Sequence, residues 1–141
     1  MDECEFPTTN ATSQEIVDIL NTSKVIAVIG ASLKPERPSH WISVYLKAQG
    51  YKVIPVNPGL TDVLGDKCYK SLSDIPEPVD IVDIYREPGA VPGIVDEAIA
   101  KKAKVIWMQQ GIVHNAAAEK AKAAGLKVVQ NKCIYQEHMN L

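Results

Sequence analysis

The sequence predicts an α/β fold: one three-layer domain with a mostly parallel sheet of five or six strands. Short apolar segments recur along the chain at residues 24–29, 51–56, 79–85, 104–108 and 126–130. Segments with helical periodicity lie between them, and turn residues follow each one. Strands that alternate with helices pair in parallel through right-handed crossovers, so helices cover both faces of the sheet.

The bulk composition is ordinary for a single globular domain. The 141 residues are 46% apolar and 23% charged, with a formal net charge of −2. We therefore expect no general attraction to nucleic acid or to an anionic membrane. The opening MDECEFPTTN lacks the basic and apolar parts of a signal peptide, and no window approaches the roughly 18 apolar residues of a membrane span. Cys4, Cys68 and Cys133 are far apart, which indicates neither a zinc site nor a disulfide framework and favours a cytoplasmic location.

The domain is expected to begin at residue 12, after a flexible arm over residues 1–11. Thr12 and Glu15 have the spacing of a capping box, in which each side chain satisfies the backbone N–H of the other residue. Apolar residues at helical spacing follow, so a helix is predicted to end near residues 21–23 and to pack one face on the body of the domain.

Residues 24–39, KVIAVIGASLKPERPS, are the most informative stretch. The strand over 24–29 is followed by the turn Gly30-Ala31-Ser32, and a helix is predicted from Ser39 to residue 49. Free N–H groups at a helix start attract anions, and a residue without a side chain lets a phosphate approach the backbone. We therefore interpret this turn as a phosphate site for a nucleotide-like cofactor.

The remaining elements follow from apolar runs, Gly and Pro. Strands are predicted over 51–56, 79–85, 104–108 and 126–130, and helices over 87–102 and 116–124. Pro92-Gly93 predicts a break or a late start in the first of these helices, and Asn115 is expected to cap the second. The connection over 60–78 contains a short strand near 67–69 and a helical turn near 72–75, and the tail forms a last helical turn. Trp107 is predicted to lie in the core, while Asp80 and Asp83 are expected to meet N–H groups, neighbouring polar groups or solvent rather than to form an acid–base pair.

A ligand is expected at the carboxyl ends of the strands, where parallel sheets bind their ligands. The turn is not a dinucleotide fingerprint, because Ser32 and Pro35 stand where glycines are needed. No acidic residue follows the second strand to bind the ribose of NAD. Lys34, Arg37 and Arg86 instead suit a ligand with several phosphates, and Ser32 and Ser39 add hydroxyl groups. Coenzyme A (CoA), with a pyrophosphate and a 3′-phosphate, has that character.

The sequence resembles the stand-alone CoA-binding proteins with a Rossmann-like fold, related to the CoA-binding N-terminal domain of the succinyl-CoA synthetase α subunit. The resemblance covers about residues 14–141. It is carried by VIAVIGAS (25–32), P-x-R-P-S (35–39), YLKAQGYKVIPVNP (45–58), YKSLSDIPEPVDIVDIYR (69–86), WMQQGI (107–112) and AAGLKVVQNKCI (123–134).

This resemblance implies a set of CoA contacts. Gly30, Ala31 and Ser32 would contact the pyrophosphate, and Lys34 and Arg37 would contact phosphate. Val56, Asn57 and Pro58 would flank the adenosine, while Tyr85, Arg86, Gln109 and Gly111 would line the rest of the groove. The chain is too short to contain the synthetase domain that bears a phosphorylated histidine, so the resemblance implies binding of CoA or an acyl-CoA more than catalysis.

Alternatives remain open at this stage. An NADP-linked enzyme would use Lys34 and Arg37 for the 2′-phosphate, with a homodimer supplying the second wall of its pocket. An interaction domain without a small ligand would present the same basic loop to an acidic partner. A CoA-binding module would instead serve a larger enzyme partner. Cys133, after the last strand, is either an inert thiol or lies near the crevice and forms a disulfide with CoA.

Overall fold

The fold is a five-stranded parallel sheet in the strand order β2-β1-β5-β6-β7, which confirms the predicted α/β class. The computed structural model describes residues 5–141. The neighbouring strands of this sheet pair in parallel throughout. The strands are β1 (Val25–Ile29), β2 (Lys52–Val56), β5 (Ile81–Ile84), β6 (Val105–Met108) and β7 (Lys127–Val129).

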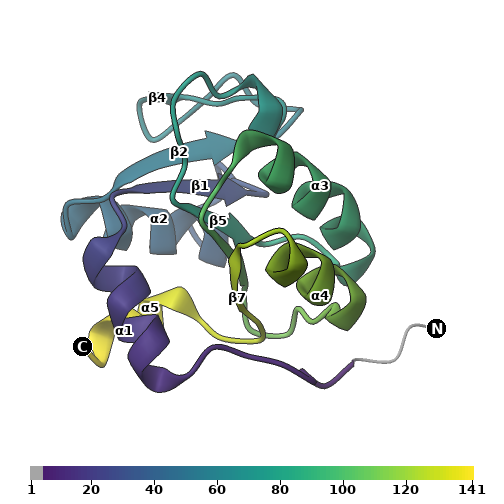
Figure 1. Ribbon diagram of the computed structural model, residues 1–141. Coiled ribbons are helices and arrows are strands. Elements are labelled where there is room, and N and C mark those ends of the chain that lie inside the picture. The colour runs from purple at the N-terminus through teal and green to yellow at the C-terminus, as the bar shows by residue number, and fades with distance from the viewer. Residues whose placement is uncertain (1–4) are drawn as a thin grey trace.

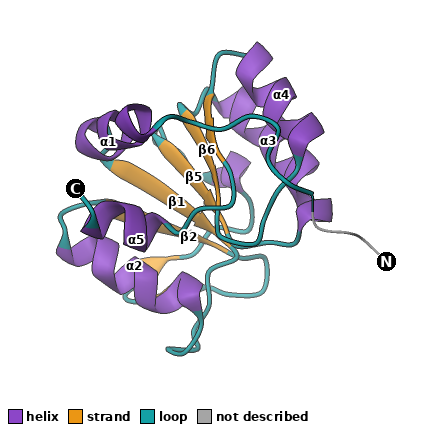
Figure 2. Cartoon of the chain, turned by 90° about the horizontal axis from the view of Figure 1, so that it is seen from below, coloured by secondary structure: helices purple, strands orange, loops and turns teal. Residues whose placement is uncertain are grey.

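Helices cover both faces of the sheet, as the three-layer prediction requires (Figures 1 and 2). One face carries α1 (Ser13–Thr22), α2 (Pro38–Ala48) and α5 (Ile134–Met139), and the other carries α3 (Val91–Lys101) and α4 (Asn115–Ala123). Because strand side chains alternate between faces, each face has its own apolar cluster. Trp107 belongs to the cluster beneath α1, α2 and α5 and is fully buried, as predicted.

The strand order reverses direction at β1. From β1 the chain passes through α2 to β2 on one side, then crosses back to pair β5 with the other side of β1. The carboxyl ends of β1 and β5 therefore diverge into helices and loops on opposite sides, which opens a crevice at this point of a doubly wound sheet. The sequence predicted the strands but not this order.

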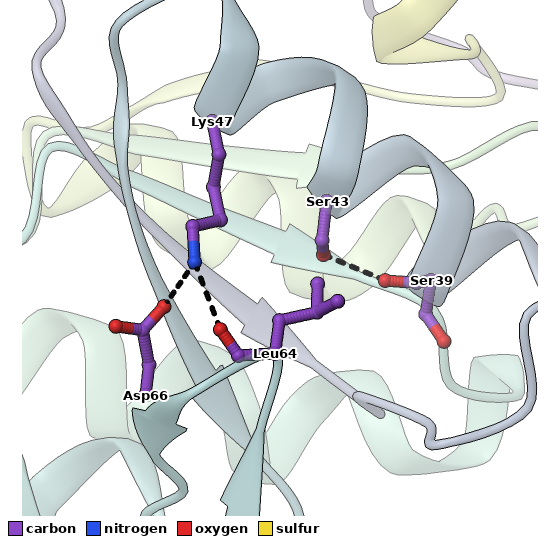
Figure 3. Close-up of polar contacts among 5 residues, drawn as sticks. All are labelled: Ser39, Ser43, Lys47, Leu64 and Asp66. Atoms are coloured by element: carbon purple, nitrogen blue, oxygen red, sulfur yellow. Dashed lines mark hydrogen bonds and ion pairs between the residues drawn. The ribbon is translucent and has the colours of Figure 1, made fainter.

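The connection between β2 and β5 folds into a small hairpin rather than one short strand. β3 (Asp62–Val63) pairs antiparallel with β4 (Asp66–Lys67), and a 3-10 turn, η1, spans Leu72–Asp74. Tyr69, inside the predicted strand 67–69, makes only a single parallel bridge to Val56. Figure 3 shows how Lys47 of α2 holds the hairpin, with its Nζ 2.6 Å from Asp66 Oδ2 and 3.1 Å from the Leu64 carbonyl.

Helix starts agree with the prediction at α1 and differ from it at α4. Thr12 caps α1, and the reciprocal bonds with Glu15 confirm the capping box. α3 starts late, at Val91, after the 3-10 turn η2 (Pro88–Ala90), so Pro92 lies in its first turn. The predicted cap of α4 was wrong by one residue, because His114 accepts the N–H of Ala117.

Residues 5–11 lie against the domain through hydrogen bonds to α4 and to the end of β7. Asn10 exchanges two hydrogen bonds with the backbone of Gln130, and the Thr9 carbonyl accepts from the Gln130 side chain. The Asn115 side chain accepts from the Thr8 N–H, so it holds this segment instead of capping the helix. Within residues 5–141, no helix combines the length and apolar character needed to cross a membrane.

We predict that Thr12→Ala lowers the free energy of unfolding by about 0.5–2 kcal/mol, because the Glu15 N–H at the start of α1 loses its acceptor. Urea denaturation measures the change. Ser13→Ala is the matched control, since Ser13 is exposed and makes no cap bond. Equal stability of the two variants would contradict a stabilising role for the cap.

Candidate functional site

The crevice at the carboxyl ends of β1 and β5 is built around Gly30. Gly30 has φ +96°, a conformation that favours glycine. A Cβ at this position would lie 3.2 Å from the Tyr85 carbonyl oxygen and 3.4 Å from Arg86 Cδ. Gly30 thus combines an unusual backbone angle with close approach to the end of β5. Both conditions favour glycine at the end of the first strand.

The turn does not offer the free N–H groups that the sequence analysis assigned to it. The N–H groups of Gly30 and Ala31 both donate to the Val56 carbonyl, at 3.0 and 3.2 Å. The interpretation of these two amides as phosphate donors was therefore wrong, because the end of β2 already occupies them. Further along, none of the described residues accepts a hydrogen bond from the N–H of Ser32, Leu33 or Ser39.

The loop after the turn is held in place by its own polar groups. His40 donates through Nδ1 to the Ser32 carbonyl at 2.7 Å, which fixes the imidazole tautomer. The Ser32 hydroxyl accepts from the Lys34 N–H at 3.0 Å. α2 then begins at Pro38, where the missing N–H costs nothing, and Ser43 donates to the Ser39 carbonyl at 2.6 Å (Figure 3). The Ser32 and Leu33 amides thus lie in a loop whose backbone is held by hydrogen bonds, and the Ser39 amide lies in the first turn of α2.

Two cavities meet at Gly30, which lines both of them. The smaller holds about 360 Å³ and lies over the end of β2. Its polar lining consists of Asn57, Lys70, Ser71, Arg86 and Glu97. Glu97 accepts hydrogen bonds from the Ser73 N–H and hydroxyl. The cationic side chains in the lining of this cavity are Lys70 and Arg86.

The larger cavity holds about 510 Å³, which is within the range of ligand sites. Ser32, Arg37 and Ser39 line it from the loop and the start of α2. Cys133, just before α5, and Tyr135, in the first turn of α5, line it as well. Trp41 and Tyr85 contribute aromatic surface, and Gln109 contributes an amide. One cavity therefore joins a cationic loop to an aromatic, thiol-bearing wall.

The structure brings most of the predicted site residues to one or the other cavity. Gly30, Ser32, Arg37, Ser39, Tyr85 and Gln109 line the larger, and Gly30, Val56, Asn57, Pro58 and Arg86 line the smaller. Ala31, Lys34 and Gly111 line neither. Ala31 is buried and its carbonyl accepts from Asn57 Nδ2 at 2.8 Å, Lys34 is exposed, and the Gly111 N–H donates to Asn131.

Some cavity residues were missed by the sequence analysis. Lys70 stands in a loop without periodicity, and only the bridge between Tyr69 and Val56 brings it beside the end of β2. Trp41, on α2, is 40% exposed and lines the larger cavity. Tyr135 meets Trp41 edge to face, with ring centroids 5.1 Å apart. An aromatic pair split between residue 41 and residue 135 leaves no local signal in the sequence.

Arg86 divides its charge between the smaller cavity and Glu87. Its Nη2 lies 3.1 Å from Glu87 Oε1, and both side chains are largely exposed. The guanidinium of Arg86 lowers the pKa of the Glu87 carboxyl. An exposed ion pair of this kind contributes little to stability, so Arg86 can exchange this partner for a phosphate at small cost.

Asp83 and Tyr85 form a buried polar pair beneath the larger cavity. Asp83 is fully buried in the sheet, in register with Val28 of β1 and Trp107 of β6. Neither its oxygens nor the Tyr85 hydroxyl has a hydrogen-bond partner among the described residues. Burial raises the pKa of Asp83 to about 8, and the nearby Tyr85 hydroxyl opposes this shift to a smaller extent. Burial, and then the neighbouring Asp83, raises the pKa of Tyr85 well above its usual value. Both groups are therefore mostly neutral at pH 7.

The fold and the crevice define a class of protein: a doubly wound, Rossmann-like α/β domain with its ligand crevice at the reversal of strand order. Residues 24–139 match the CoA binding domain family, and the chain belongs to that family.

Known relatives include both stand-alone proteins and parts of larger enzymes. The chain is 40% identical to the uncharacterized protein YneT of Bacillus subtilis, over 92% of this chain and 96% of the relative. A hypothetical protein from Pyrococcus horikoshii has a solved structure with a TM-score of 0.91 and 42% identity, covering 100% of this chain and 99% of the other. An ADP-forming acetate–CoA ligase of Methanocaldococcus jannaschii is 29% identical over 84% of this chain, which spans 18% of the ligase. These relatives give no support to the NADP-linked alternative.

We predict that Asp83 makes stability fall as the pH rises. A carboxyl with a raised folded-state pKa contributes stability that is complete below its unfolded pKa and is lost as the pH approaches 8. Between pH 5 and pH 8, the free energy of unfolding of the wild-type protein should fall by on the order of 3 kcal/mol more than that of Asp83→Asn. Urea denaturation at both pH values measures this difference, and parallel pH profiles of the two proteins would contradict it.

Proposed function

We propose that this protein binds CoA, or an acyl-CoA, across the two cavities that meet at Gly30. The observation that carries the proposal is the meeting of these cavities at the reversal of strand order, in a chain of the CoA binding domain family. CoA has a nucleotide and a long thiol-bearing arm joined by a pyrophosphate. A divided site with a cationic loop between its halves fits that shape.

In this arrangement the pyrophosphate lies beside Ser32, Leu33 and Ser39, whose N–H groups lack acceptors among the described residues. Arg37 supplies positive charge on the same loop and lines the larger cavity. The adenosine enters the smaller cavity over Val56, Asn57 and Pro58, with its 3′-phosphate near Lys70 and Arg86. The pantetheine arm enters the larger cavity, toward Tyr85 and Gln109.

We further propose that the protein binds its ligand without carrying out ligase chemistry. Each of its three histidines has a structural contact: His40 holds the Ser32 carbonyl, His114 caps α4, and His138 lies 2.6 Å from the Tyr45 hydroxyl. None of them lines either cavity. The protein therefore serves as a CoA-responsive module, acting alone, as a homodimer or with a larger enzyme partner.

Isothermal calorimetry with CoA and with dephospho-CoA tests the ligand class and the place of the 3′-phosphate. Wild-type protein should bind CoA about 10- to 100-fold more tightly than dephospho-CoA, as expected for one or two charge-assisted hydrogen bonds. Lys70→Ala should weaken CoA binding and leave dephospho-CoA binding nearly unchanged. Lys120→Ala is the matched control, because Lys120 is on α4 and pairs with Asp96. Absence of CoA binding at high micromolar concentration would refute the proposal. If Lys70→Ala weakened the binding of CoA and dephospho-CoA equally, Lys70 would not contact the 3′-phosphate.

Arg37→Ala should weaken the binding of both CoA and dephospho-CoA by about 1–3 kcal/mol, because the proposed contact is to the pyrophosphate that the two ligands share. The same calorimetric titrations measure the loss. Arg37 is exposed, so thermal unfolding of the free variant should match that of the wild type. Unchanged affinity for both ligands would mean that Arg37 remains solvated in the complex.

A further inference from the structure

The larger cavity contains one nucleophile that noncovalent binding does not use, the thiol of Cys133. Cys133 is half-buried and lies in the wall formed by the segment that leads into α5. Its thiol is therefore accessible from the same space that the proposed pantetheine arm enters.

The backbone on both sides of Cys133 is fixed to β6 and to the turn after it. Trp107 donates through Nε1 to the Lys132 carbonyl at 2.8 Å, and the Gln109 side chain accepts from the Ile134 N–H at 3.0 Å. Trp107 and Gln109 are both buried. Two buried side chains thus hold the backbone before and after Cys133, so the core of the domain fixes the position of its backbone.

Tyr85 adds a buried polar group to the lining of the same cavity. Tyr85 lines the cavity together with Cys133, and its buried hydroxyl has no hydrogen-bond partner of good geometry among the described residues, although the Asp83 carboxyl is close enough to raise its pKa. The thiol of Cys133 is near enough to contribute, after burial and Asp83, to the raised pKa of Tyr85. Buried polar atoms without partners are rare in native proteins. A protonated hydroxyl beside a thiol can donate a hydrogen bond to sulfur as that sulfur gains negative charge.

We propose that Cys133 is a covalent attachment point for the thiol end of CoA, formed by thiol–disulfide exchange with the disulfide form of CoA. This inference rests on the proposed function, because the nucleotide must first occupy the crevice around Gly30 for the exchange to be selective. The product is a mixed disulfide between Cys133 and CoA.

The step balances without any further oxidant. The Cys133 thiol gives its proton to solvent, and the thiolate attacks one sulfur of the CoA disulfide. The new sulfur–sulfur bond forms as the old one breaks, and the departing CoA thiolate takes up a proton. One CoA becomes attached and one reduced CoA leaves.

Cys68 provides an internal comparison. It is buried beside the hairpin, lines neither cavity, and points its Sγ toward the Asn57 carbonyl at 3.6 Å. Burial raises the pKa of the Cys68 thiol, which lowers its thiolate fraction at neutral pH. Cys4 lies outside the described residues, and peptide mapping of the adduct measures its reactivity directly.

The experiment incubates reduced, desalted full-length protein with CoA disulfide at neutral pH and follows intact mass without reductant. We expect one attached CoA, mapped by peptide analysis to Cys133 and released by dithiothreitol. Adduct formation should be at least about tenfold faster than with oxidised glutathione, because docking of the nucleotide raises the local disulfide concentration. Cys133→Ser should lose the adduct, whereas the matched variant Cys68→Ser should keep it.

A parallel titration of wild-type protein with reduced CoA, in the presence of reductant, separates the two proposals. If reduced CoA binds but no adduct forms, the covalent step is refuted while the proposed function stands. An adduct on Cys4 or Cys68, or equal rates with CoA disulfide and oxidised glutathione, also refutes it. If reduced CoA does not bind, the proposed function fails and the selective exchange fails with it. Peptide mapping of the wild type decides the site even if Cys133→Ser does not fold.

Discussion

The structure around the crevice depends on one shared acceptor, the Val56 carbonyl at the end of β2. It accepts the N–H groups of both Gly30 and Ala31, while Asn57 returns a hydrogen bond to the Ala31 carbonyl. These bonds tie the ends of β2 and β1 together beyond the last ladder pair. On the other side, a Cβ on Gly30 would lie only 3.2 Å from the Tyr85 carbonyl oxygen. The ends of β1, β2 and β5 therefore all contact Gly30, which fixes the point where the following loop leaves the sheet.

These hydrogen bonds explain why the proposed anion-binding groups lie after the Gly30-Ala31 turn rather than on it. A turn whose first two amides complete the sheet cannot also offer them to a ligand. The first N–H groups without acceptors among the described residues belong to Ser32 and Leu33, with Ser39 at the start of α2. Gly30 lines both cavities, and the residues after β5 contribute to each of them, with Arg86 in the smaller cavity and Tyr85 in the larger.

The sequence predicted the elements whose formation depends on residues close together in the chain. The strands, the capping box at Thr12 and the late start of α3 at Pro92 each follow from neighbouring residues. Predicting the acceptor of the Gly30 N–H required the strand order, which pairs β2 with β1. Lys70 reaches the smaller cavity only through the bridge between Tyr69 and Val56. For Asp83, the sequence shows a polar residue within an apolar strand. Only the packing of β1, β6 and the helices around it shows that its carboxyl is buried, with no hydrogen-bond partner among the described residues.

The C-terminal segment, from Cys133 into α5, forms one wall of the larger cavity. Cys133 and Tyr135 line that cavity, and both lie within the stretch that matches the CoA binding domain family. Tyr135 packs on Trp41 and Tyr45 of α2, so α5 joins the helix that begins at the cationic loop. Buried contacts from Trp107 and Gln109 fix the segment to β6. The segment that carries Cys133 is thus held from two sides, by the aromatic contacts of Tyr135 with α2 and by the hydrogen bonds to Trp107 and Gln109.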